Sequence, residues 1–412
     1  MSQHEVIVVG AGIVGMATAL SLQREGHKVT VLDSGAPGSG ASMGNAGCIC
    51  PASCVPESGP GVMMQAPGWL ADPLGPLALR WRYLPKFLPW LIRFIRAGQP
   101  DRVEAQSQAL RALYRSAYDA YTPLLQFAGA SGLFQKIGYV IAYETEAAWN
   151  KDRGSFAMRA RRGVQMTELD EAGMRALEPA LNPAFKRGVQ LTENGYCTDP
   201  LLLVQRFAEA FANAGGVIKQ EKVADCAADA DAITVVTDHG VQRAERLVVA
   251  AGARSHFLAA QLGSKVPLET ERGYHAQLAD PGVSPSLPVM SGEHKFIATP
   301  MRLGLRFAGT VEFAGLEAEP NWGRAEKLMQ LGKRMYPDLN TDKPSFWMGH
   351  RPSLPDSLPV ISQSPHHRSV FYAFGHAHLG LTGAAVTGQI IADMVAGRTP
   401  AIDPSPYAVD RF

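Results

Sequence analysis

The chain has 412 residues, of which 46% are hydrophobic and 19% are charged. A chain of this length exceeds what one hydrophobic core usually supports, so we expect two domains, and the composition excludes a disordered protein. Lys and Arg number 39 and Asp and Glu 38, which gives a net charge of +1. So small a net charge argues against a nucleic-acid-binding protein.

The start of the sequence and its apolar runs bear on the compartment in which the protein works. The first strand-like run begins at Glu5, so we expect no signal peptide. No run of about eighteen apolar residues occurs, so we expect no transmembrane helix. The odd number of cysteines, 5 in all, argues against a disulfide scaffold. We therefore expect a cytoplasmic protein.

A glycine-rich motif follows the first run of β-branched residues. Residues 6–9 (VIVV) are typical of a strand buried on both faces of a parallel sheet. The next six residues fit G-x-G-x-x-G and lead into an expected helix: they are Gly10, Ala11, Gly12, Ile13, Val14 and Gly15. A second strand is expected over residues 29–32, with Asp33 at its carboxyl end.

Each part of this unit has a physical role in holding a dinucleotide. Gly10 allows a tight turn, Gly12 lets a pyrophosphate approach the backbone, and Gly15 lets helix and strand pack closely. The helix N-terminus offers free N–H groups to the phosphates. Asp33 lies where an acid binds a ribose hydroxyl. The strand–helix–strand order, ending in an acid, predicts a dinucleotide site.

The segment after Asp33 favours flavin over nicotinamide. Residues 34–47 read SGAPGSGASMGNAG, a connection far longer than is usual between strand and helix. Small residues permit backbone contact along a ribityl chain and a flavin ring. A mobile surface loop is the alternative interpretation.

Four motifs together resemble the D-amino-acid oxidase-like flavoenzymes, especially the bacterial D-amino-acid dehydrogenase branch. Residues 42–47 match the family's S-x-x-N-A-G loop, and residues 248–255 match its V-x-A-A-G-A-x-S strand. Residues 351–361 match R-P-x-x-P-D-x-x-P-x-I, and residues 375–380 match G-H-x-x-x-G. The resemblance spans nearly the whole chain and implies FAD as the cofactor.

The same resemblance implies an α/β fold with two domains. An FAD-binding Rossmann-like domain would be assembled from three separate segments, residues 1–55, 196–265 and 341–412. Residues 56–195 and 266–340 would form a mixed-sheet, α+β substrate-binding domain.

Residues expected to contact FAD come from every one of the cofactor segments. They are Gly10, Gly12, Ile13, Val14, Gly15, Asp33, Ser34, Ser42, Asn45, Ala46, Gly47, Val223, Ala251, Gly252, Arg351, Gly375, His376, Gly380, Leu381 and Thr382. A last helix is expected over residues 382–395. Its small residues at the start would let the backbone lie against the flavin, where the helix N-terminus would stabilise the negative charge of the reduced ring. Packing of that helix on the sheet through its small residues is the alternative.

Four residues are expected in the substrate site. By resemblance, Arg351 holds the substrate carboxylate, because a guanidinium grips a carboxylate with two hydrogen bonds; a salt bridge between domains is its alternative role. Tyr274, Arg272 and His376 are further candidates, and Arg306 is a weaker one. D-amino-acid oxidases proper have a second arginine where this chain has Leu354. No obligatory side-chain base is evident from the sequence.

Three cysteines follow the flavin loop at positions 48, 50 and 54. Their spacing fits no familiar zinc pattern, so we expect no metal. Small buried side chains are the preferred interpretation, and covalent attachment of flavin to one of them stays open.

A basic, aromatic stretch covers residues 79–96 (LRWRYLPKFLPWLIRFIR). Pro85 and Pro89 argue against one continuous helix. Basic and aromatic side chains together suit an anionic membrane surface, and dehydrogenases of the resembled branch pass electrons to membrane quinone. The alternatives are peripheral binding to the inner face of the plasma membrane and a helical cover of the substrate domain.

The leading functional hypothesis is an FAD-dependent dehydrogenase acting on D-amino acids. It would oxidise the Cα–N bond to an imine by hydride transfer to flavin N5, and water would then give a keto acid and ammonia. Quinone or another carrier would take the electrons. The alternatives are oxidation of a secondary amino acid (hydroxyproline, proline or N-methylglycine type), a nicotinamide-dependent dehydrogenase, and a flavin-binding accessory subunit without catalysis.

Overall fold

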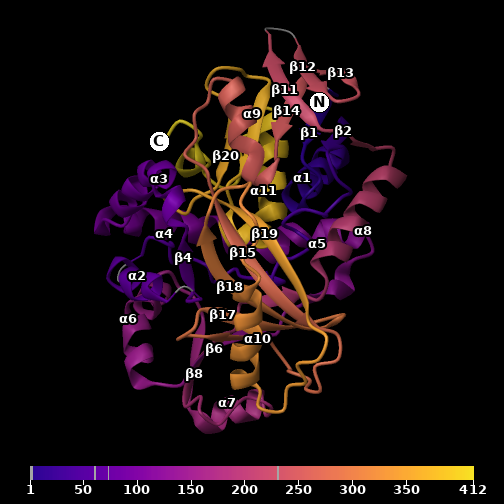
Figure 1. Ribbon diagram of the computed structural model, residues 1–412. Helices are drawn as coiled ribbons and strands as arrows, with labels where there is room; N and C mark the ends of the chain where they lie inside the picture. Colours follow the sequence, from indigo (N-terminus) through magenta and orange to yellow (C-terminus); the bar gives the residue numbers. More distant parts are fainter. Residues whose placement is uncertain (1–2, 60–61, 73, 230–231) are drawn as a thin grey trace.

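The computed structural model describes residues 3–59, 62–72, 74–229 and 232–412. Two large sheets form its framework, one in the upper part of Figure 1 and one below it, with long strands running between. This arrangement of strands and helices confirms the expected mixed α/β fold class. The two sheets are assembled from segments far apart in the sequence.

The smaller of these sheets has the order β10-β2-β1-β14-β21-β20. Its strands are β1 (Glu5–Val9), β2 (Lys28–Asp33), β10 (Val217–Gln220), β14 (Arg246–Val249), β20 (Val360–Gln363) and β21 (Val370–Phe374). All pairs are parallel except β20–β21. Helix α1 (Ile13–Arg24) connects β1 to β2 and packs on α8 (Pro200–Asn213) and α11 (Gly380–Val395). The predicted strand–helix–strand unit and the last helix are therefore confirmed.

The larger sheet is mixed and has the order β19-β15-β18-β17-β16-β6-β8-β7, with β4 beside β18. Its strands are β4 (Leu77–Leu79), β6 (Tyr139–Tyr143), β7 (Met166–Leu169), β8 (Arg187–Leu191), β15 (Glu269–Leu278), β16 (Val289–Ser291), β17 (Phe296–Met301), β18 (Gly304–Phe313) and β19 (Ser345–Ser353). Helix α10 (Gly323–Met335) packs on β15 and β18, and Figure 1 shows it across this sheet.

Two small sheets and the remaining helices complete the fold. The small sheets are β11-β12-β13 (Val223–Ala228, Ile233–Thr237, Gly240–Ala244) and β3-β9-β5 (Cys48–Ile49, Gly195–Cys197, Phe134–Gln135). The other helices are α2 (Val62–Ala71), α3 (Leu84–Ala97), α4 (Pro100–Tyr114), α5 (Ala117–Phe127), α6 (Glu146–Arg161), α7 (Glu171–Leu177) and α9 (Ser255–Gln261).

Two segments lie elsewhere than their predicted domain implies. Strand β19 was expected with the cofactor segments, but it pairs with β15 along its whole length, from Ser353 opposite Glu269 to Ser345 opposite Gln277. Helices α4 and α5 were expected with the substrate segments, but both pack on α11. Long-range pairing and packing decide these placements, and sequence order does not reveal them.

The basic, aromatic stretch is not one continuous helix, because a 3₁₀ turn (Trp81–Tyr83) precedes α3, but an interruption at Pro89 is not found. Helix α3 is continuous from Leu84 to Ala97 and contains Pro89. Pro85 lies in the first turn, where a backbone N–H has no helical partner to lose. Phe87 and Trp90 are buried against Phe313.

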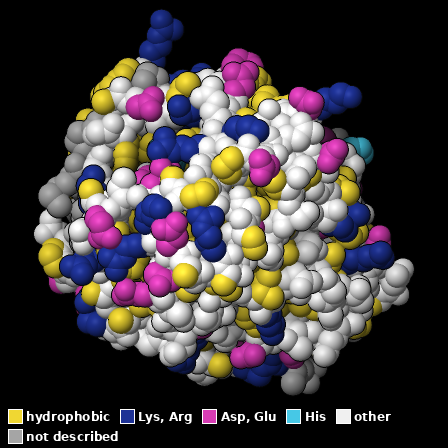
Figure 2. Space-filling model, turned by 90° about the horizontal axis from the view of Figure 1, so that it is seen from below, with side chains coloured by type: hydrophobic (Ala, Val, Ile, Leu, Met, Phe, Trp, Pro, Cys, Tyr) yellow, Lys and Arg dark blue, Asp and Glu magenta, His cyan; other side chains and the backbone are white. Residues whose placement is uncertain are grey.

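No helix within the described ranges combines the length and apolarity that crossing a bilayer requires. On the face seen from below, acidic and basic side chains are interspersed (Figure 2). That face presents no broad field of one sign, in keeping with the net charge of +1.

Candidate active site

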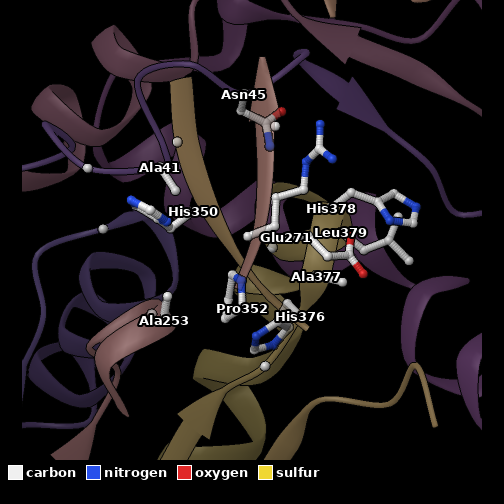
Figure 3. A pocket seen from close by; sticks show the side chains of 18 of the residues that line it. Ala41, Asn45, Ala253, Glu271, His350, Pro352, His376, Ala377, His378 and Leu379 are labelled. Carbon is white, nitrogen blue, oxygen red and sulfur yellow. The ribbon is translucent and has the colours of Figure 1, made fainter. Parts of the chain in front are cut away.

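A cavity of about 1630 Å³ draws its lining from both large sheets. Figure 3 looks into it, with His378 and Leu379 on one side and Ala41 and His350 on the other. The predicted cofactor residues that line it are Gly10, Gly12, Ile13, Val14, Asp33, Ser34, Ser42, Asn45, Ala46, Val223, Ala251, Gly252, Arg351, Gly375, His376, Gly380 and Leu381. Gly15, Gly47 and Thr382 lie outside the lining.

The start of the chain forms a cradle for a dinucleotide. Gly10 has φ +115°, and a Cβ there would lie 2.3 Å from the Ala250 carbonyl oxygen. A Cβ on Gly15 would lie 1.9 Å from the Gly10 oxygen, so Gly15 acts through helix–strand packing. A Cβ on Gly12 would meet only the Ser42 hydroxyl, at 3.4 Å. Gly12 therefore leaves the space that a pyrophosphate needs in front of α1.

Asp33 shapes the ribose end of this cradle. Its carboxylate accepts hydrogen bonds from the backbone N–H of Ala11 (2.7 Å) and of Gly35 (2.9 Å). A carboxylate has about four acceptor sites, so two stay available for ribose hydroxyls. The residues present thus fit an FAD, held by the glycine motif, Asp33 and the loop that ends at Gly47.

The larger sheet fixes that flavin loop in place. Arg306 donates to the carbonyl oxygens of Met43 (3.2 Å) and Asn45 (2.5 Å). His275 Nδ1 lies 3.0 Å from the Gly44 oxygen, and the Trp347 ring covers Gly44 so closely that a Cβ would lie 2.1 Å from it. Arg306, a weaker candidate for the substrate, lies outside the cavity lining and holds the loop instead.

Loss of Arg306 should weaken FAD binding. Hydrogen bonds from a charged group contribute about 1.5–3 kcal/mol each, so Arg306→Gln should raise the FAD dissociation constant roughly tenfold or more. Flavin fluorescence during dilution of the holoenzyme measures this constant. Arg302→Gln is the matched control, because Arg302 lies on the surface and pairs with Asp199. Equal constants for all three proteins would refute the role assigned to Arg306.

Arg351 enters the cavity from β19. Its guanidinium lies over Gly273 of β15, where a Cβ would come within 2.3 Å of Nη2. It donates to the carbonyl oxygens of Thr310 (3.1 Å) and Gly309 (3.5 Å). Thr310 holds φ 60°, which is uncommon for a β-branched residue. Among the described residues no carboxylate lies within 4 Å of Arg351, so the alternative of a salt bridge between domains is not found.

Two acids in the cavity were missed by the sequence reasoning. Glu271 lies opposite Arg351 in the β15–β19 register, lines the cavity and is 5% exposed. Glu57 lines the same region, where His378 Nδ1 lies 2.8 Å from Oε1 and the Ser353 hydroxyl lies 3.4 Å from Oε2. Strand alternation from Gly273 places residue 271 on the same face, and this was the signal available in the sequence.

The two acids differ in their tendency to ionise. Burial raises the pKa of Glu271 well above its ordinary value, and the negative charge of Glu57 adds to this effect. Burial also opposes ionisation of Glu57, but the hydrogen bond and charge of His378 and the charge of Arg351 lower its pKa overall. At neutral pH the two carboxyls therefore hold one proton, mostly on Glu271.

Arg272 does not belong to the cavity lining, which corrects its expected place in the substrate site. It is fully buried, pairs with Glu312 at 3.3 Å and donates to the Glu319 oxygen at 3.2 Å. Alternation along β15 turns it away from the face of Gly273. Tyr274 borders the cavity, but its hydroxyl donates to Glu312 (2.5 Å) and accepts from Asn321 N–H (2.9 Å).

His376 lines the cavity but is 3% exposed. Its Nε2 lies 2.8 Å from the Thr387 hydroxyl in α11. Burial lowers the pKa of His376 to about 3, so the ring is neutral and cannot supply a positive charge. Its contact with Thr387 anchors the turn that precedes α11.

The cysteines after the flavin loop divide between cavity and core. Cys48 and Cys50 line the cavity, whereas Cys54 is buried, and burial raises the pKa of its thiol. The Cys50 N–H donates to the Thr382 hydroxyl at 3.0 Å, which ties this segment to α11. No group of ligands suited to a metal occurs in the part of the chain that the structure describes.

Gly273→Ala tests whether the position of Arg351 depends on a missing side chain. The new methyl would displace the guanidinium and weaken its expected contact with the substrate carboxylate. We therefore expect KM for the substrate to rise roughly tenfold or more, as when a charge pair is lost. The visible spectrum of bound FAD should persist. Steady-state kinetics and the spectrum are the two measurements, and an unchanged KM would contradict this account of Arg351.

The parallel sheet, the glycine cradle and the shared cavity define a dinucleotide-binding protein. The chain belongs to the FAD-dependent oxidoreductase family described as DAO, whose profile matches residues 5–394. Its cofactor is FAD.

Curated relatives match the chain over its full length. It is 41% identical to a D-amino-acid oxidase from Bradyrhizobium diazoefficiens and 32% identical to a D-amino acid dehydrogenase from Paramagnetospirillum magneticum, each covering 99% of both chains. Among solved structures, glycine oxidase from Geobacillus kaustophilus gives a TM-score of 0.74 at 21% identity, covering 100% of both chains. L-proline dehydrogenase from P. horikoshii gives 0.76 at 17%, covering 100% and 98%. At such identities these structures support the fold alone.

Proposed function

We propose that the protein oxidises the Cα–N bond of a D-amino acid to an imine, which water converts to a keto acid and ammonia. One observation carries this proposal: the Arg351 guanidinium, with no carboxylate within 4 Å among the described residues, lies in the cavity that also contains the FAD cradle. A substrate carboxylate would complete its coordination. FAD, when bound, supplies the acceptor for the two electrons and the Cα hydrogen.

The chain's own residues would bind and orient the substrate. Arg351 fixes the carboxylate, and the carbonyl oxygens of Gly309 and Thr310 fix the guanidinium. Leu354 stands where D-amino-acid oxidases proper carry a second arginine, and it packs within 2.4 Å of the space a Cβ on Gly375 would fill. A single arginine would therefore set the direction of Cα, and the cavity walls would limit the side chain.

The relatives named above support the D configuration and the amino-acid class. Oxidation of a secondary amino acid on the same scaffold stays the second candidate within the class. An accessory subunit without catalysis is the alternative of another kind. We also propose that the predicted FAD residues that line the cavity contact the cofactor. The two-domain division is proposed as predicted, except that residues 345–353 belong to the substrate-binding domain.

The acceptor of the electrons is proposed to be quinone or another carrier, and molecular oxygen is the competing acceptor.

Helix α3 carries a surface that is suited to membrane binding. Its apolar Leu88, Ile92 and Ile95 are exposed at 46%, 41% and 41%, beside exposed basic side chains. We propose that this face binds the anionic inner surface of the plasma membrane, which would make the protein cytoplasmic and peripheral.

An anaerobic screen of D-, L- and cyclic amino acids tests the proposed reaction. The flavin absorbance of the holoenzyme should bleach with D-amino acids, whereas an accessory subunit would show no bleaching. Arg351→Ala should lower kcat/KM by about 10²-fold or more, since losing a partner of a buried charge pair costs about 2–5 kcal/mol, and should leave FAD bound. Unchanged kinetics in this variant would remove Arg351 from the site. Rapid recolouring in air would favour oxygen over a carrier.

Co-sedimentation with vesicles containing anionic lipid tests the membrane proposal. Each basic residue contributes about 1 kcal/mol at such a surface, so replacing Lys86, Arg93 and Arg96 by Gln should abolish most of the salt-sensitive binding. Lys151→Gln with Arg153→Gln, in the exposed part of α6, is the matched control. If the wild type does not bind the vesicles, or if both variants bind equally, the membrane proposal is wrong and α3 only covers the cavity.

A further inference from the structure

The cavity holds a cation and an acid that face each other without forming an ion pair. Glu271 and Arg351 are directly opposite in the antiparallel β15–β19 register, and both side chains line the cavity. The guanidinium lies across Gly273 toward Gly309 and Thr310. Among the described residues, no salt bridge within 4 Å joins Glu271 to any cation. Arg351 has only carbonyl oxygens as partners and is therefore suited to a ligand carboxylate, because a buried charge without an opposite charge is costly. Glu271 is the acid nearest to it in the register and is suited to the cationic part of such a ligand.

The surroundings of Glu271 provide a second carboxyl within reach. Glu57 lies next to it and is itself bonded by His378 from the Ala377–Leu379 turn. The groups that face this pair are Arg351 and Ser353 of β19, His378, and Tyr114 of α4. Figure 3 shows Glu271 and His378 among the cavity side chains. A cationic ligand beside this pair would favour ionisation of Glu271, which could then take a proton from the ligand.

Resting on the function proposed above, we propose that Glu271 and Glu57 bind the α-ammonium group of the substrate and accept its proton. With the substrate carboxylate on Arg351, the ammonium group would lie toward the acid on the neighbouring strand. An amino acid is a zwitterion, and this arrangement of one guanidinium and one acid pair matches its two charges.

One proton moves from the substrate ammonium group to the acid pair. An N–H bond of the ammonium breaks, its electron pair stays on nitrogen as the lone pair that forms the imine, and the proton goes to Glu271. Glu271 takes this proton in its ionised form, because the proton that it held before binding has gone to solvent, and Glu57 stays ionised. The substrate thus becomes a neutral amine inside the cavity, with its proton on Glu271.

The pH dependence of flavin bleaching tests the proposal with D-alanine and the holoenzyme. The wild type should be reduced efficiently near neutral pH, because the pair deprotonates the bound ammonium. Glu271→Gln should slow reduction at pH 7 by about 10²-fold, the usual contribution of a positioned base. The variant should regain the wild-type rate near pH 10, where the amine arrives already neutral. Glu57→Gln should shift the profile in the same direction.

Glu269→Gln is the matched control. Glu269 lies two residues away on β15, is 9% exposed, bonds the Tyr83 hydroxyl and lies outside the cavity lining. Its profile should follow the wild type. An equal rate at pH 7 in Glu271→Gln, or a loss at pH 7 that persists at pH 10, would overturn the proposal. A wild type that no amino acid bleaches would instead overturn the proposed function.

Binding of benzoate, a carboxylate without an ammonium group, gives a readout independent of turnover. Benzoate should perturb the flavin spectrum through its place on Arg351. Glu271→Gln should bind it as tightly as the wild type, because a protonated Glu271 and a glutamine are both neutral. Weaker benzoate binding in this variant would show a disrupted cavity and would overturn the assignment of Glu271 to the ammonium group.

Discussion

The guanidinium of Arg351 can lie in the cavity only because Gly273 has no side chain. The strand that carries Gly273 runs beside β19, and the space above that glycine is filled by the arginine. Two carbonyl oxygens of β18 then complete the support. Three adjacent strands of one sheet therefore fix the direction of one positive charge, and a rigid sheet holds such a group more accurately than a loop would.

The same sheet also fixes the flavin loop. Arg306 on β18, His275 on β15 and Trp347 on β19 all contact residues 43–45. Burial lowers the pKa of His275 to about 3, so this contact is made by a neutral ring. The loop and the arginine therefore share the strands that hold them, whereas the glycine motif and Asp33 belong to the other sheet. Under the proposed function, this shared support would place the substrate carboxylate relative to the part of FAD beside the loop.

The features that predicted FAD are local in the sequence. The glycine motif, Asp33 and the following loop lie within about fifty residues, and each feature acts on its neighbours in the chain. The substrate side depends on long-range register, which one sequence does not reveal. Arg272 was expected in the site, yet alternation along β15 turns it toward Glu312, while Glu271, one residue earlier, faces the cavity. The expected interruption at Pro89 is not found for a different reason: α3 continues through Pro89, and its Phe87 and Trp90 pack against Phe313.

Glu271 and Arg351 lie in the same cavity but form no ion pair. A direct ion pair between Glu271 and Arg351 would lower the charge of the empty cavity, but it would compete with any zwitterion that entered. Separation across the face of the sheet avoids that competition, and the cost is reduced because Glu271 stays protonated beside Glu57. In the proposed arrangement, the carboxylate of a bound zwitterion would meet Arg351 and its ammonium group would meet the acid pair. Selectivity for molecules that carry both charges would then follow from the cavity itself, whatever side chain they bear.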